Sequence, residues 1–147
     1  MANVYNRGKL AVTNGTLGAT GWSTGGADVG VLLVGAGYVY DPDHNFVSDL
    51  SNELAGGGYA RVTALGGRTI TEDDANDRVG YDALDATFTT LGAGAGTPTQ
   101  AIVFNNTPGV DTAKELIARI PLTAPPLPNG GDYTIQWDAS GVFRLDD

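Results

Sequence analysis

The sequence contains no cysteine and only one histidine, and these two scarcities exclude several kinds of chemistry. Without cysteine there is no disulfide, no thiolate nucleophile and no cysteine-ligated metal site. His44 alone cannot supply a metal site built from several histidines, and a Ser–His catalytic pair would have to use that one residue. We therefore predict that the protein is not an enzyme and has no catalytic residue, no cofactor-binding residue and no metal ligand.

Positive charge is also scarce, because Lys9 and Lys114 are the only lysines and the net charge is −9. Proteins that bind nucleic acid neutralise phosphates with clusters of Lys and Arg, and anionic membranes attract the same residues. No apolar run reaches the roughly 18 residues of a membrane span. Residues 1–7 lack the apolar run of a signal peptide. We therefore expect synthesis in a cytoplasm and neither nucleic acid nor membrane as a partner.

What is abundant points to β-structure. The chain has 22 glycines and 41% hydrophobic residues, but only 17% charged residues, against roughly 25% on average. This composition suits many strands and turns. We predict an all-β fold, or a β-dominated one with one or two short helices, arranged as an antiparallel β-sandwich or jelly-roll-like sheet. We expect one domain over residues 1–147, with residues 1–8 as an extended arm that orders only against a neighbour.

Short apolar runs predict the buried strands. Residues 28–40 contain a nearly continuous run and predict a central strand, and residues 100–105 predict a second. Alternation over 115–122 predicts a strand, with a short helix at 112–119 as the alternative. A hairpin about Gly66–Gly67 is expected from residues 59–65 and 68–71, and further strands from 79–83 and 87–91.

Two segments carry helical signals. Phe46, Leu50 and Leu54 stand at i, i+4 and i+8, which predicts a one-sided short helix over 44–54 with His44 solvated at its start. Residues 9–17 are compatible with a strand that turns at Asn14–Gly15 or with a short helix that Gly15 ends.

The last alternation in the chain is the most regular. Tyr133, Ile135 and Trp137 alternate with polar residues, 138–141 reads as a turn, and 142–145 returns. We therefore predict a C-terminal hairpin with Trp137 in the core.

Two motifs resemble ligand sites only in part. Residues 29–37 look like a strand entering a dinucleotide-binding glycine loop, but Tyr40 stands where that loop needs Gly or Ala. Residues 41–45 match the first ligands of an EF-hand, but Phe46 and Asn52 occupy its sixth and twelfth positions. The acidic segment 72–77 is interpreted as a solvated turn, with an irregular calcium site as the alternative.

Several stretches of the chain resemble a family of small virion structural proteins of tailed bacteriophages, which includes capsid decoration and accessory head proteins. They are Met1-Ala-Asn-Val-Tyr-Asn-Arg-Gly-Lys9, Val31-Leu-Leu-Val34, Tyr40-Asp-Pro-Asp-His-Asn-Phe-Val47, Glu53-Leu-Ala-Gly-Gly-Gly-Tyr-Ala-Arg61, Thr69-Ile-Thr-Glu-Asp-Asp74 and Asn129-Gly-Gly-Asp-Tyr-Thr-Ile-Gln-Trp137. Residues 35–37 are unusual for that family.

The resemblance implies a structural role in a virion, after synthesis in the cytoplasm of a bacterial host. The expected function is a capsid decoration or cement protein that binds and stabilises the outer surface of the capsid lattice. Its expected partners are the major capsid protein or other virion proteins, and it is expected to be a homo-oligomer. The alternatives are a tail or neck component of the virion, or a carbohydrate- or receptor-binding β module.

Overall fold

The computed structural model describes residues 2–15, 21–22, 28–107, 109–123 and 127–146. The fold is β-dominated with antiparallel strand pairs, as predicted. Its elements are β1 (Asn3–Val4), α1 (Asn6–Thr13), β2 (Val29–Val34), the 3-10 turn η1 (Val47–Asp49), β3 (Thr69–Asp73), β4 (Arg78–Asp82), β5 (Ala86–Phe88), the 3-10 turn η2 (Ala93–Ala95), β6 (Gln100–Asn105), β7 (Leu116–Pro121), β8 (Tyr133–Ile135) and β9 (Phe143–Asp146).

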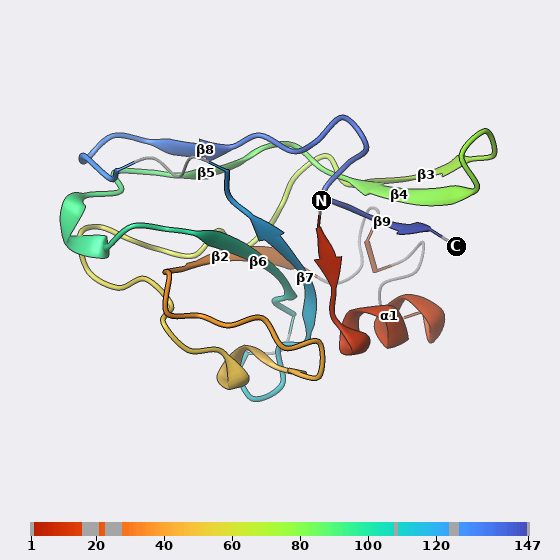
Figure 1. The fold of residues 1–147 in the computed structure, drawn as a ribbon, viewed down its shortest axis with the longest axis horizontal. Coiled ribbons are helices and arrows are strands. Elements are labelled where there is room, and N and C mark those ends of the chain that lie inside the picture. The colour runs from red at the N-terminus through yellow and green to blue at the C-terminus, as the bar shows by residue number, and fades with distance from the viewer. Residues whose placement is uncertain (1, 16–20, 23–27, 108, 124–126, 147) are drawn as a thin grey trace.

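A central sheet in the order β1-β7-β6-β2 forms the middle layer of the molecule (Figure 1). Every residue of β2 and β6 is buried, which explains the continuous apolar runs at 29–34 and 101–104. Alternate side chains point to opposite faces. Val31 and Val103 belong to one hydrophobic cluster, whereas their neighbours Leu32 and Ile102 belong to another. The sheet is therefore covered on both sides.

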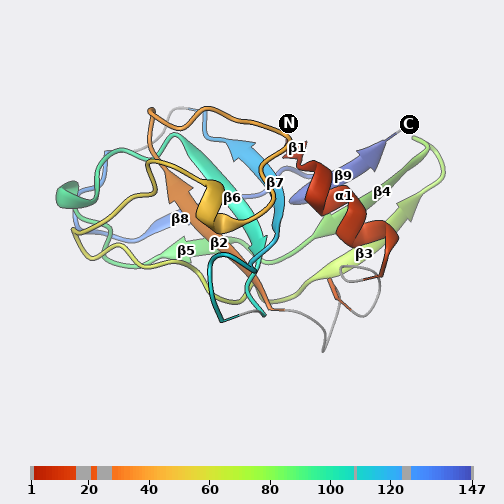
Figure 2. The same cartoon turned by 90° about the horizontal axis from the view of Figure 1, so that it is seen from below.

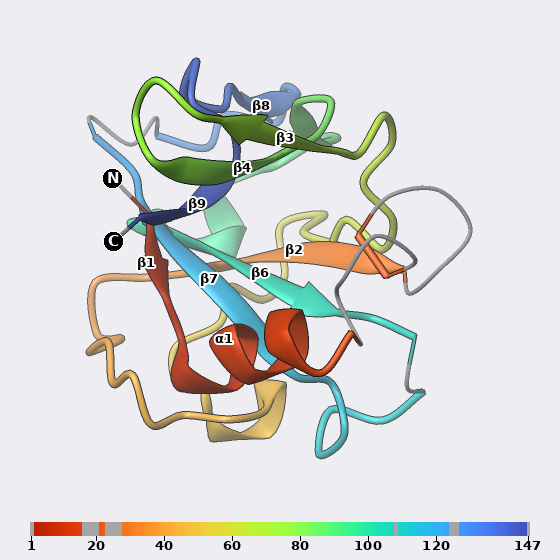
Figure 3. The ribbon, with the colours of Figure 1, turned by 90° about the vertical axis from the view of Figure 1, so that its right-hand side faces the viewer.

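Two smaller sheets, β3-β4-β9 and β5-β8, cover one face of the central sheet (Figures 1 and 3). Trp22 lies in this interface and is fully buried, with edge-on contacts to Tyr81 and Phe143. Its indole N–H donates a 3.0 Å hydrogen bond to the Asp82 carbonyl. Trp22, Tyr81 and Phe143 all belong to the larger hydrophobic cluster.

A layer of loops covers the opposite face, and we call residues 35–53 and 109–115 the loop layer (Figure 2). Backbone N–H groups of Val47 and Leu116 donate to Lys114 and Asn45 carbonyls, both at 2.9 Å. The smaller hydrophobic cluster, which includes Tyr5, lies beneath this layer.

The helix predicted over 44–54 is wrong, because only η1 forms there. The Asp49 carboxylate accepts backbone N–H bonds from Asn45 at 2.9 Å and Phe46 at 3.0 Å. Leu50 is then extended, with ψ of 144°. A side chain that bonds nearby backbone N–H groups competes with helical bonding.

The extended N-terminal arm predicted for residues 1–8 is also contradicted over its described part. β1 pairs with β7, Tyr5 is fully buried, and α1 begins at Asn6 and packs on β7. The helical alternative for 9–17 holds as far as Thr13, and residues 16 and 17 lie outside the described residues. The low apolar content of residues 1–8 did not predict that they pack on the sheet, because their partner, β7, is more than 100 positions away in the chain.

The two predicted hairpins do not form. β8 pairs with β5 and β9 pairs with β4, so only an isolated bridge from Asp138 to Gly141 joins the C-terminal pair. Residues 59–65 form no strand, and β3 pairs with β4 instead. The remaining strand predictions are confirmed, although β2 ends at Val34 and not at residue 40. β7 forms where a short helix was the alternative, and β4 and β5 overlap 79–83 and 87–91.

Candidate functional site

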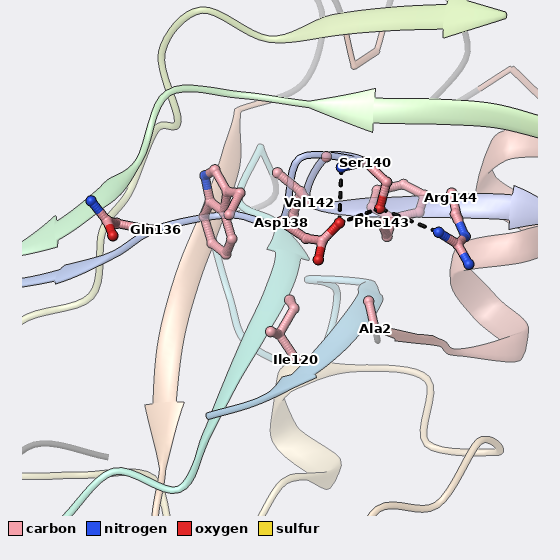
Figure 4. A pocket seen from close by; sticks show the side chains of 10 residues that line it. Ala2, Ile120, Gln136, Asp138, Ser140, Val142, Phe143 and Arg144 are labelled. Atoms are coloured by element: carbon pink, nitrogen blue, oxygen red, sulfur yellow. Dashed lines mark hydrogen bonds between the residues drawn. The ribbon is translucent and has the colours of Figure 1, made fainter. Parts of the chain in front are cut away.

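A pocket lies between β7 of the central sheet and β9 with the turn that precedes it (Figure 4). It has a volume of about 310 Å³. Ile120 of β7 lines it from the central sheet, whereas Val142 and Phe143 line it from β9 and its preceding turn. Ala2, which precedes β1, also lines the pocket (Figure 4). We call this cavity the edge pocket.

Trp137 forms one wall of the edge pocket. Its indole N–H donates a 2.9 Å hydrogen bond to the Leu84 carbonyl, and its backbone N–H donates a 3.2 Å bond to the Asp85 carboxylate. The first bond fixes the orientation of the ring, and the second anchors the backbone that carries it. Trp137 is half-buried, so the prediction that it belongs wholly to the core is only partly met; the fully buried tryptophan is Trp22.

Polar groups line the rest of the edge pocket (Figure 4). Asp138 Oδ1 accepts the backbone N–H of Ser140 at 2.9 Å and its hydroxyl at 2.6 Å. These bonds lower the pKa of the Asp138 carboxyl. Arg144 donates to the Ser140 hydroxyl at 3.3 Å and to Asp146 at 2.7 Å. The Ser140 hydroxyl therefore donates to a carboxylate and accepts from a guanidinium, and the arrangement suits hydrogen bonding.

A second charged group holds the loop layer together. Arg61 donates to Glu53, with both nitrogen–oxygen distances at 2.6 Å, and to Asp111 at 2.8 and 2.9 Å. Lys114 Nζ lies 3.2 Å from Asp111. Hydrogen bonds from Arg61, opposed by partial burial, lower the pKa of Asp111 to about 2. Arg61 bonds to both carboxylates, so this network stabilises the loops.

His44, expected in solvent at a helix start, is half-buried in the loop layer. Its Nδ1 lies 3.3 Å from the Tyr38 hydroxyl, which in turn lies 2.7 Å from the Tyr5 hydroxyl. Burial, followed by the hydrogen bond to Tyr38, raises the pKa of Tyr5. The three side chains form a polar chain under the loop layer, and no serine or carboxylate side chain among the described residues bonds to it.

The glycine motif at 29–37 and the acidic segment at 72–77 take conformations that differ from the ligand sites they resemble. β2 pairs antiparallel with β6 and leads into a turn at residues 36–37, whereas a dinucleotide fold would place a helix after a parallel strand. In the acidic segment, Asp73 accepts bonds from Asn76 and Arg78. Among the described residues, no group of three or more His, Asp or Glu side chains is placed to hold a metal ion.

The spacing of residues 21–25, Gly-Trp-Ser-Thr-Gly, matches the nucleophile elbow of α/β-hydrolases, and the prediction of no catalytic residue overlooked it. Ser23 lies outside the described residues. The preceding Trp22 packs in the cluster on one face of the central sheet, whereas His44 contacts Tyr38 in the cluster on the other. Trp22 and His44 therefore lie on opposite faces of the central sheet.

Sequence reasoning placed Trp137 in the core and Asp138 in a turn, and it did not single out Arg144 at all. The sequence feature that could have indicated the edge pocket is the run of aromatic and hydrogen-bonding residues from Gln136 to Arg144. No helix among the described residues is long and apolar enough to cross a membrane. Comparisons with family models, with characterised proteins and with solved structures found no match.

Proposed function

We propose that this protein is a non-enzymatic structural component of a tailed-phage virion, and that it decorates the outer surface of the capsid lattice. The proposal rests on the sequence resemblance together with one structural observation. That observation is the loop layer, a firmly held surface that exposes apolar side chains among acidic ones.

Val39 is 78% exposed and Val110 is 62% exposed, although both are large apolar residues. Val39 follows β2 and Val110 precedes β7, so the loop layer presents both. The Arg61 network fixes the loops that carry them. Exposed apolar side chains on a rigid surface are typical contact points for another protein.

Acidic residues surround these contact points. Asp41, Asp43 and Asp49 are exposed in the same layer. A partner surface with complementary basic groups would be attracted, and packaged DNA would be repelled by a chain of net charge −9. The charge therefore supports an outward position over one inside the capsid.

Decoration of a lattice also favours several copies acting together, because linked weak contacts give high total affinity. We therefore propose a homo-oligomer whose copies bind the major capsid protein through the loop layer. A tail or neck position is the alternative within the same proposal, and it depends on the same kind of surface.

A pelleting assay with purified heads and tails tests this function. The protein should sediment with heads, and the double variant Val39→Asp, Val110→Asp should lose most of that binding. Leu127→Asp is the matched control, because Leu127 is 78% exposed but lies outside the loop layer. Equal pelleting of all three proteins would contradict the assigned surface, and sedimentation with tails alone would move the protein to the tail.

A further inference from the structure

The edge pocket combines an aromatic wall with polar groups that are already held in place. Because the indole N–H of Trp137 is bonded to the Leu84 carbonyl, the part of the ring left for the cavity is hydrocarbon. Val142 and Phe143 extend this apolar lining. A ligand for this wall needs an apolar face, and an aromatic ring of fixed orientation favours stacking.

The polar side of the pocket requires a ligand that also carries hydrogen-bonding groups. Asp138 uses Oδ1 for Ser140, and its Oδ2 has no hydrogen-bond partner among the described residues. Gln136 is exposed and offers a planar amide with both a donor and acceptor. Arg144 Nη2 remains available beyond the bonds that Nε and Nη1 make. Three planar groups thus offer both donors and acceptors.

From this combination we infer that the edge pocket binds a neutral saccharide, with one hexose or N-acetylhexosamine unit stacked on Trp137 and its hydroxyl groups bonded to Asp138, Gln136 and Arg144. A pyranose ring has an apolar face of C–H groups and a rim of hydroxyls that both donate and accept. The volume of about 310 Å³ lies at the small end of ligand pockets, which suits one or two sugar units. A net charge of −9 disfavours acidic sugars.

The lining groups are arranged before a ligand arrives. The ring is fixed by its bond to Leu84, and the Asp138 carboxylate is fixed by two bonds from Ser140. Little side-chain entropy is therefore lost on binding. The inference is independent of the loop layer, because the edge pocket is lined from β7, β9 and residues 136–142, so either proposal can fail alone.

Tryptophan fluorescence gives a direct test, because Trp22 is fully buried and Trp137 lines the pocket. The intact protein would be titrated with the methyl glycosides of glucose, galactose, mannose and N-acetylglucosamine. We expect a saturable change with at least one of them, with a Kd on the order of 1 mM. Trp137→Phe should abolish the change while leaving the Trp22 emission intact.

Two further variants test the polar contacts. Asp138→Asn should weaken binding about tenfold or more, since it replaces a charged acceptor. Gln136→Ala removes an exposed amide that bonds to no other described residue, and it should weaken binding about threefold or more. Asp74→Asn, an equal charge change on the β3–β4 turn, should leave the affinity unchanged.

NMR chemical-shift mapping locates the bound sugar. Shifts should concentrate on residues 136–144. Shifts confined to another surface would overturn the inference, as would no saturable response to any of the four glycosides up to about 100 mM, where a Kd of order 10 mM would be nearly saturated. A fluorescence change that persists in Trp137→Phe would overturn it as well.

Discussion

Gly8 of α1 lies directly against the backbone of Ile117 in β7. A β-carbon placed on Gly8 would come within 2.9 Å of the Ile117 Cα and would also overlap its carbonyl oxygen. Both are backbone atoms of a central strand, so neither can turn aside. This contact joins the N-terminal helix to the sheet that it covers.

The contact predicts that Gly8→Ala destabilises the protein, although alanine is the better helix former. We expect the free energy of unfolding to fall by about 2 kcal/mol, from overpacking partly offset by a gain in helix propensity of up to about 1 kcal/mol. Urea denaturation measures the change. Lys9→Ala, at the next and exposed position of the helix, should change stability by less than about 0.5 kcal/mol. A stabilised Gly8→Ala would mean that α1 does not pack on β7.

The two tryptophans should respond differently to the same substitution. Trp22→Phe removes a fully buried ring volume and a bond to Asp82, so we expect a loss of about 3 kcal/mol. Trp137→Phe removes the bond to Leu84 from a half-buried ring and should cost about 1 kcal/mol. Thermal and urea unfolding of both variants provide the comparison. Equal losses would contradict the burial assigned to the two rings.

The Asp111 carboxyl should contribute to acid sensitivity. Its pKa is about 2 in the folded protein, against an ordinary value of 3.8, so the unfolded chain binds this proton more readily. The stabilisation is therefore complete above about pH 4 and is lost as the pH falls through 2.

Asp111→Asn removes this dependence. We expect a loss of about 1 kcal/mol at neutral pH, kept small because Asp111 is 42% exposed, and a shallower fall in stability between pH 4 and 2. Asp74→Asn serves as the control, since Asp74 makes no ion pair among the described residues. An unchanged pH profile in Asp111→Asn would show that Arg61 does not hold this carboxylate in solution.

The buried strands could be predicted from the sequence because their signal is local. Continuous apolar runs marked β2 and β6, and alternation marked β7 and β8. The pairing of strands could not be predicted from the sequence, since β8 and β9 follow one another in the chain yet belong to different sheets. Hairpin signals describe neighbours in the chain, whereas these pairings join residues about 45 to 68 positions apart.

The edge pocket could not be predicted from the sequence either, because it depends on contacts between segments far apart in the chain. Trp137 alternates with polar residues in the manner of a core position, and its half-exposed state depends on where the Leu84 carbonyl lies. Arg144 reaches the pocket only because β9 pairs with β4. The buried Trp22 had no apolar pattern around it, since glycine, serine and threonine are its sequence neighbours.

The most direct measurement of the proposed function is a cryo-EM map of the virion whose genome encodes this chain, combined with peptide mass spectrometry of its separated heads and tails. We predict density for this fold in many copies on the outer capsid surface, with Val39 and Val110 facing the major capsid protein. Absence of the chain from purified virions, or its location inside the capsid against DNA, would contradict the account.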